Sequence, residues 1–176
     1  MSDGLVERAR RGDVDAFVEL IATRQESMVR IAYAILGEPA DAEDALQDAL
    51  GAIWRGLPSL RDAARFGAWS DRILVNACRL TLRRRSRMRI RFVPLDGADN
   101  TAADDSGMDE ARPARIALDA AFDRLDPDHR AILVLHHLEG RPLAEIAAAL
   151  KVPVGTVKSR LHTARLALQR ALEEPS

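Results

Sequence analysis

The sequence contains little cysteine and few aromatic residues. Its single cysteine, Cys78, excludes an intramolecular disulfide and any metal site built from several cysteines. Aromatic residues make up only 4% of the chain, and the abundance of Ala, Leu and Arg favours helices over strands. These two features predict an all-α fold.

Long hydrophobic runs are also missing. Charged residues interrupt every apolar stretch, so no segment resembles a signal peptide or a membrane span. We therefore expect a cytoplasmic protein without direct membrane insertion. The sequence has no phosphate-binding glycine loop and no metalloprotease helix motif, so we expect no enzyme, metal or cofactor. His136 and His137 do not suggest a metal site, because adjacent helix positions point about 100° apart.

The charges are distributed unevenly, although the net charge is only −1. Residues 83–91 form a block rich in arginine, and residues 96–110 contain acidic residues without any basic one. Helical periodicity is lost in the acidic segment. We therefore predict two helical modules, residues 1–91 and 113–176, joined by a flexible acidic linker over residues 92–112.

Apolar spacing predicts the helices within each module. In the first module they cover about residues 5–11, 14–36, 39–57 and 62–89, and in the second about 114–125, 127–138, 143–150 and 153–172. Gly37, Pro39 and the Asp126-Pro127 pair supply plausible helix ends and starts. The expected buried stripes are Leu46, Leu50, Ile53 and Leu57 in the helix from 39, and Phe66, Trp69, Ile73, Ala77 and Leu80 in the helix from 62.

Residues 143–161 have the spacing of a helix-turn-helix motif. Their apolar residues would pack inside, and a turn of about three residues separates two helices. The basic and hydroxyl side chains of the second helix suit phosphates and base edges. The alternative is a helical hairpin with a solvated basic face. The outward residues expected to contact DNA are Thr156, Lys158, Ser159, Arg160, His162, Thr163 and Arg165.

A stripe on the predicted helix from 62 suits single-stranded DNA. Arg72, Asn76, Arg79 and Arg83 are spaced i, i+4, i+7 and i+11, which places them on one narrow face. The aromatic residues Phe66 and Trp69 flank this stripe and can stack bases, while the arginines follow phosphates. The alternative is that both aromatic residues belong to the core, and that the arginines interact with the helix dipole.

An acidic and polar face is expected on the helix from 39. Asp44, Gln47 and Asp48 lie opposite its buried stripe, and Trp54 lies near the boundary. This face suits a basic protein partner. Taken alone, it fits a soluble, well-capped surface better than a docking face, because acidic residues stabilise a helix N-terminus in any case.

Three segments together resemble the extracytoplasmic-function group of sigma-70-type sigma factors. Residues 41–54 (DAEDALQDALGAIW) resemble the segment that binds the polymerase clamp helices. Residues 65–85 (RFGAWSDRILVNACRLTLRRR) resemble the promoter-melting and minus-ten segment, and residues 118–168 resemble the C-terminal region. VPVGTVKSRL, at 152–161, is the most specific piece. The resemblance covers nearly the whole chain outside the linker.

This resemblance implies a sigma factor with regions 2 and 4 in residues 1–91 and 113–176. Its partners would be core RNA polymerase, through the clamp helices and the flap, promoter DNA, and an anti-sigma factor. Asp44, Gln47, Asp48 and Trp54 would face the polymerase. Asn76 would hold a flipped minus-ten base, with Phe66, Trp69, Arg72, Arg79 and Arg83 around it, and the outward residues of the helix from 153 would meet the minus-thirty-five element.

Two residues depart from the family pattern. Leu80 stands where many relatives have Asp, and Lys151 stands where many have Gly, in a turn whose backbone can require positive φ. A different class of protein also stays open, namely a stand-alone helix-turn-helix regulator with a helical dimerisation or sensing module. The polar, basic stripe from Arg72 to Arg83 argues against it, because a dimerisation face would be more uniformly apolar.

Overall fold

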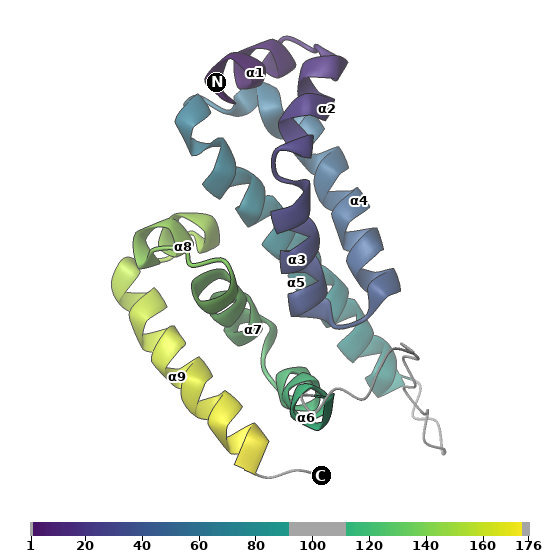
Figure 1. The fold of residues 1–176 in the computed structure, drawn as a ribbon, viewed down its shortest axis with the longest axis vertical. Helices are drawn as coiled ribbons and strands as arrows, with labels where there is room; N and C mark the ends of the chain where they lie inside the picture. The colour runs from purple at the N-terminus through teal and green to yellow at the C-terminus, as the bar shows by residue number, and fades with distance from the viewer. Residues whose placement is uncertain (1, 92–111, 174–176) are drawn as a thin grey trace.

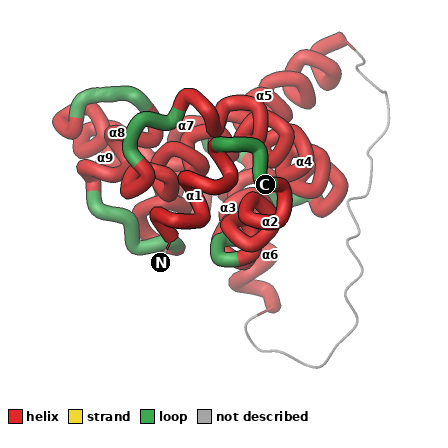
Figure 2. The backbone as a smooth tube through the Cα atoms, turned by 90° about the horizontal axis from the view of Figure 1, so that it is seen from above, coloured by secondary structure: helices red, strands yellow, loops and turns green. Residues whose placement is uncertain are grey.

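The computed structural model describes residues 2–91 and 112–173, and within these ranges it contains helices and no strands (Figures 1 and 2). The prediction of an all-α fold is confirmed. The predicted linker lies outside the described residues except for Arg112, which begins α6. The first module contains α1 (Ser2–Arg10), α2 (Val14–Ala22), α3 (Gln25–Leu36), α4 (Pro39–Gly56) and α5 (Phe66–Arg91). The second contains α6 (Arg112–Asp123), α7 (Pro127–Leu133), α8 (Leu143–Leu150) and α9 (Val154–Glu173).

Short elements complete the chain. Two 3₁₀ turns, η1 (Leu57–Ser59) and η2 (Ala63–Arg65), connect α4 to α5. A π-helical turn, η3 (Val134–Leu138), continues α7. The predicted helix over residues 127–138 therefore exists, but its last turn is wider than an α-helix.

Local sequence explains most helix ends. Gly37 closes α3 with φ of 73°, a left-handed conformation that glycine adopts without steric cost. Pro39 occupies the first turn of α4, as predicted. Asp126 caps α7, since its carboxylate accepts a hydrogen bond from the backbone N–H of Asp128 at 2.8 Å.

The single helix predicted over residues 14–36 is wrong. The chain forms α2 and α3 with a break at Thr23 and Arg24. The Thr23 hydroxyl donates to the Leu20 carbonyl at 2.7 Å, and the Arg24 guanidinium pairs with Asp71 on α5. A local side-chain hydrogen bond and a distant ion pair therefore override the apolar periodicity.

The predicted buried stripes are only partly correct. On α4 the buried residues are Ala42, Ala45, Ala49 and Ile53, whereas Leu46 and Leu50 are only partly buried. Small alanines let α4 pack closely against its neighbours α3 and α5. Leu57 is buried, as predicted.

On α5 the buried face differs in a similar way. Leu74, Val75, Cys78 and Leu82 are buried, whereas Leu80 is 52% exposed. The other predicted core residues of α5, Trp69, Ile73 and Ala77, are partly buried, and Phe66 is buried. The reason is that α5 packs against α3 and α4 on one side and against α7 and α8 on the other. A sequence pattern cannot reveal that second side.

The two modules share one continuous hydrophobic core. It runs from Val6 in α1 to Ala164 in α9 without interruption. Figure 1 shows α7 and α8 lying beside α3 and α5, while the last turns of α5 extend beyond the bundle in Figure 2. In this conformation the second module therefore covers part of the first.

Candidate nucleic-acid interface

The helix-turn-helix motif is formed by α8 and α9. Ile146, Val157 and Leu161 are buried between them, and Ala147 permits their close approach. Lys151 closes α8 with φ of 55° and ψ of 44°, and its backbone N–H donates to the Ala147 carbonyl. Within the described ranges it is the only non-glycine residue with positive φ. The expectation that this position requires a left-handed backbone is confirmed.

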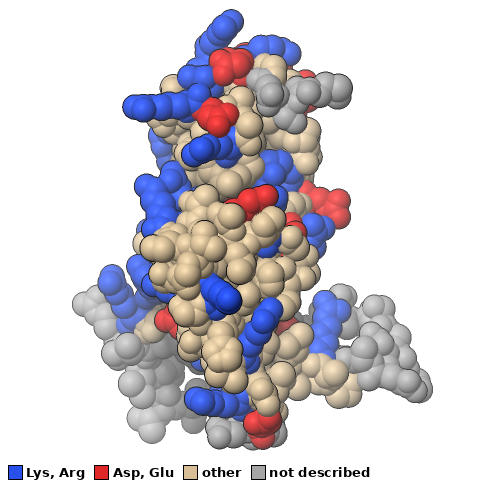
Figure 3. Space-filling view, turned by 90° about the vertical axis from the view of Figure 1, so that its left-hand side faces the viewer, with Lys and Arg blue, Asp and Glu red and all other residues tan. Residues whose placement is uncertain are grey.

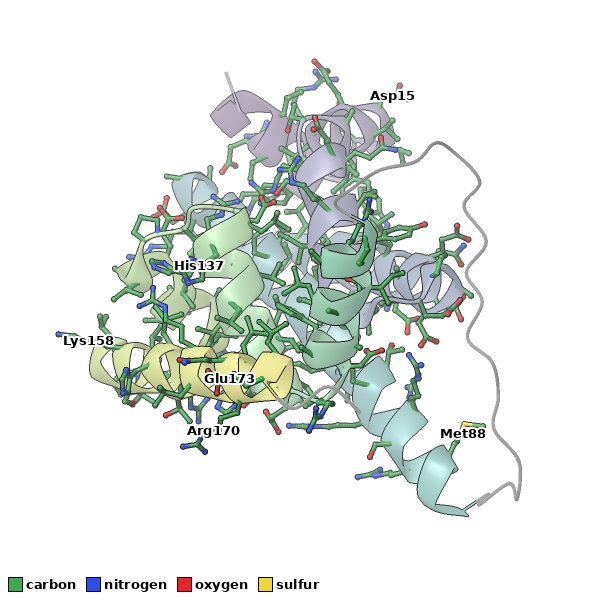
Figure 4. The ribbon with its side chains drawn as sticks, turned by 60° about the horizontal axis from the view of Figure 1, so that its bottom comes forward. Asp15, Met88, His137, Lys158, Arg170 and Glu173 are labelled. Atoms are coloured by element: carbon green, nitrogen blue, oxygen red, sulfur yellow. The ribbon has the colours of Figure 1, made fainter. Side chains whose placement is uncertain are left out.

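The outward face of α9 gathers most residues expected to meet the minus-thirty-five element. Five of them are exposed, and Thr156 and Arg160 are partly buried. The Lys158 side chain points away from the molecule in Figure 4. Viewed from the side of α9, the surface carries many Lys and Arg side chains with fewer acidic ones among them (Figure 3). The exposed five are Lys158, Ser159, His162, Thr163 and Arg165.

Several of these side chains already have partners within the protein. Ser159 and Thr163 donate to backbone carbonyls one turn earlier, at 3.0 and 3.1 Å. Arg165 Nε donates to Nε2 of His137 at 3.2 Å. Burial, together with the Arg165 charge, lowers the pKa of His137 below its ordinary value, so the neutral imidazole that accepts this bond is favoured.

The stripe on α5 is divided between exposed and paired residues. Asn76 and Arg83 are exposed, and Arg72 is partly buried. Arg79 is only 20% exposed, because its guanidinium pairs with Asp128 of α7 at 2.6 Å. Arg79 Nη1 also donates to Asn76 Oδ1 at 3.4 Å. The stripe therefore lies partly against the second module.

The aromatic part of the single-stranded DNA prediction needs correction. Phe66 is only 4% exposed and packs within the core, so in this conformation it offers no face on which a base can stack. Trp69 is partly buried. Its ring centroid lies 6.1 Å from that of Phe66, and its indole lies against Gly56. A Cβ atom at Gly56 would lie 3.0 Å from the Trp69 ring, so a larger residue there would require the ring to shift by a few tenths of an ångström.

The acidic face predicted on α4 forms as an exposed surface. Asp44, Gln47 and Asp48 are all exposed, and the structure brings them together along one side of the helix. Trp54 is different, since it is partly buried and packs against Phe17 with ring centroids 4.9 Å apart. Trp54 therefore helps to hold α2 against α4.

A cluster of charges that the sequence did not predict lies between the modules. Asp71 on α5 is almost fully buried and pairs with Arg24 of α3's N-terminal cap and with Arg141 at 3.0 Å. Glu139 accepts from Ser27 at 2.5 Å and from Arg30 at 2.8 Å. We call these six residues, Arg24, Ser27, Arg30, Asp71, Glu139 and Arg141, the inter-module charge cluster. One signal was available, since Asp71 is an acidic residue next to the apolar stripe of α5.

Burial and charge pairing have opposite effects on the pKa values of the carboxyl groups in this cluster. Burial raises the pKa of the Asp71 carboxyl, and the charges of Arg24 and Arg141 act against that increase. Burial alone would also raise the pKa of Glu139, but hydrogen bonds from Arg30 and Ser27 bring it below its ordinary value. Glu139 is therefore held as a carboxylate between the modules.

A second polar contact joins the modules near the end of α3. Arg130 of α7 is buried and donates to the Ile35 carbonyl at 3.2 Å and to Asp123 at 3.0 Å. Ile35 lies in the last turn of α3, where carbonyls lack helical partners. Arg130 thus caps a helix of the other module.

Three further observations concern metal ligands, thiol chemistry and membrane spans. Its residues contain no group of three or more His, Cys, Asp or Glu side chains able to hold a metal ion. Burial raises the pKa of the Cys78 thiol to about 12, so the reactive thiolate is disfavoured. Of the helices described, none combines the length and apolar character needed to cross a membrane.

Comparison with known proteins gives a consistent picture. Residues 20–88 match the family described as Sigma-70 region 2, and residues 115–168 match Sigma-70, region 4. The chain is 34% identical over 161 residues to the ECF RNA polymerase sigma factor SigE of Mycolicibacterium smegmatis. The aligned residues make up 90% of this chain and 62% of that relative. It is 32% identical to the RNA polymerase sigma-E factor of Streptomyces antibioticus, over 93% of the chain and 88% of that relative.

Solved structures resemble the whole arrangement. CnrH in complex with the cytosolic domain of CnrY has a TM-score of 0.69 and 28% identity, and covers 99% of both chains. The sigma factor RpoE of Bartonella quintana, in complex with the anti-sigma factor NepR, has a TM-score of 0.66 at 23% identity, which supports likeness of fold. It covers 91% of this chain and 98% of that one.

Proposed function

The chain belongs to the extracytoplasmic-function group of the sigma-70 family, and from this membership we propose which partner each of its surfaces binds during transcription initiation. The chain is an RNA polymerase sigma factor. The observation that carries the proposal is that two separate DNA-suited surfaces, on α5 and α9, occur in one chain with an exposed acidic face on α4. A stand-alone regulator does not require all three.

The acidic face is the proposed site for core RNA polymerase. Asp44, Gln47 and Asp48 present carboxylates and an amide that suit a basic partner, and no other part of the described chain covers them. Trp54, on the same helix, is held in place by its contact with Phe17. We assign its role as positioning the face, since its ring is mostly occupied by packing.

The stripe on α5 is the proposed minus-ten surface. Asn76 is exposed and has both a donor and an acceptor with which to hold the edge of a flipped base. Arg72, Arg79 and Arg83 supply cations along the same face for phosphates. Binding the flipped base favours the open duplex, because a ligand stabilises the state to which it binds better. Bond formation itself is left to the polymerase.

The outward face of α9 is the proposed minus-thirty-five surface. Lys158, Arg165 and the hydroxyl residues stand on a helix braced by α8, which is the arrangement that places side chains in a major groove. Residues 1–91 and 113–176 would then act as regions 2 and 4. The linker over residues 92–112 would run between them along the polymerase, where the flap would contact region 4.

An anti-sigma factor is a further proposed partner. CnrH and RpoE, which resemble this chain, were both solved in complexes, the latter with an anti-sigma factor. We propose that a protein of that kind binds this chain too, and that the chain acts in the cytoplasm, where the polymerase is.

Affinity capture with core polymerase and run-off transcription test the proposal together. The purified chain should bind core polymerase one to one, and the complex should start transcription at discrete sites on a genomic library. An Asp44→Lys, Asp48→Lys variant should lose binding while keeping its helical circular dichroism. The alternative result is a folded wild-type chain that does not bind polymerase, yields no discrete start sites and forms a dimer on a palindromic site. That result would establish the stand-alone regulator.

A further inference from the structure

Asp128 contacts both proposed DNA surfaces at once. It lies in the first turn of α7, between α5 and α9. Its Oδ1 pairs with Arg79 of α5 at 2.6 Å, and its Oδ2 pairs with Arg160 of α9 at 3.4 Å. One carboxylate thus joins an arginine of the minus-ten surface to an arginine of the minus-thirty-five surface.

The chemistry of this contact resembles that of a phosphate. Two oxygens with a shared negative charge receive two guanidinium groups, as a DNA phosphate would receive them. Each arginine has a limited set of N–H donors in one plane, so contact with Asp128 competes with contact to DNA. Arg79 is the more enclosed partner, at 20% exposed against 39% for Arg160. Arg79 also donates to Asn76, so the proposed base-binding residue belongs to the same group of contacting side chains.

The position of Asp128 is fixed by the packing of the modules. Arg130, two residues later, is buried and bonded to the Ile35 carbonyl of α3. At the other end of α7 and η3, Glu139 is bonded to Ser27 and Arg30. These contacts hold α7 and η3 against the first module at two points that follow Asp128 in the chain. The acidic face of α4 stays exposed in the same conformation, so polymerase binding does not require the contact to break.

We propose that Asp128 is an internal substitute for a DNA phosphate, which occupies Arg79 and Arg160 in the free protein. One residue thereby withholds one arginine of each DNA surface from phosphates until the modules separate. This inference rests on the proposed function for the assignment of the two arginines to DNA. It adds a specific autoinhibitory contact to that function.

Substitution of Asp128 tests the inference without touching either arginine. Asp128→Asn keeps the size of the side chain and removes its charge, and Asp128→Glu restores a carboxylate. The matched control is Asp119→Asn, which changes the net charge equally on an exposed face of α6 where no ion pair is found among the described residues. Any gain caused by net charge alone appears in this control as well.

The measurement is fluorescence anisotropy of labelled single-stranded and duplex DNA with the full chain, without polymerase and at low salt. Phosphate contacts do not depend on sequence, so mixed-sequence probes suffice. Asp128→Asn should bind both probes about threefold to tenfold more tightly than Asp119→Asn, which is the range for two partly exposed ion pairs. Asp128→Glu should behave like wild type.

Equal affinity of Asp128→Asn and Asp119→Asn would overturn the inference. If Asp128→Asn does not fold, Asp128→Ser replaces it, since serine is accepted in the first turn of a helix. Loss of fold in both would assign Asp128 to the stability of α7 and would also overturn the inference. Polymerase capture by the wild-type chain is measured in parallel. Its failure would refute the proposed function, whereas capture with unchanged DNA affinities would refute only the role of Asp128.

Discussion

Lys151 should be a site where a single glycine stabilises the protein. Its φ of 55° and ψ of 44° lie in the left-handed region, which costs an L-residue with a Cβ atom about 1–2 kcal/mol. Glycine removes this cost but loses about 0.5–1 kcal/mol more conformational entropy on folding. The Lys151 side chain is exposed, so no packing is lost. Lys151→Gly should therefore raise the free energy of unfolding by about 0.5–1 kcal/mol.

Thermal and urea unfolding measure this effect. For a chain of this size the gain corresponds to an increase in Tm of about 1–4 °C. Lys151→Ala is the control, because it removes the amine and most of the side chain but keeps the Cβ atom that causes the strain. The control should gain nothing. If Lys151→Gly is no more stable than Lys151→Ala, then the left-handed backbone at this turn does not carry the cost assigned to it.

Four further predictions concern the interfaces and the inter-module charge cluster. Asn76→Ala should lower open-complex formation in permanganate footprinting and leave polymerase binding intact; equal loss of both would remove Asn76 from the minus-ten surface. Lys158→Ala should weaken holoenzyme binding to the upstream duplex and reduce its salt dependence by about one charge, whereas unchanged affinity would contradict a phosphate contact. Asp71→Ala should destabilise the chain by about 3 kcal/mol in urea unfolding, the lower end for breaking a buried pair, because its arginines keep some contact with water. Glu139 has a folded-state pKa below its ordinary 4.5, so its stabilisation is present above pH 4.5 and is lost as the pH falls through the folded-state value. The stability difference between wild type and Glu139→Gln should therefore shrink below pH 4.5, and a constant difference would show that the carboxylate charge is not the cause.

The electrostatic contacts between the modules act together with an apolar interface. Leu135 and Ile146 of the second module are buried in the core that continues from the first. Ion pairs alone would not hold two modules firmly, because partly exposed pairs contribute little. Buried apolar residues and ion pairs therefore both join the modules. A partner that separates the modules must therefore replace both kinds of contact.

The sequence by itself determined the local features of this protein. Helix ends such as Gly37, Pro39 and Asp126 depend on neighbouring residues in the chain, and their backbone preferences are intrinsic. The helix-turn-helix spacing and the left-handed backbone at Lys151 were predictable for the same reason. The exposure of Asp44, Gln47 and Asp48 also follows from their place opposite an apolar stripe. The placement of these three residues needs only the rotation of about 100° per residue in a helix.

Only the tertiary structure decided which helix faces are covered and which charges are paired. At the break between α2 and α3, Arg24 pairs with Asp71, which lies 47 residues later in the chain. The pairing of Arg79 with Asp128 depends on where α7 lies against α5. Such contacts join residues far apart in the chain, and periodicity along one helix contains no information about its neighbours. The sequence therefore predicts which residues suit DNA, and the packing of the modules decides which of these side chains are exposed.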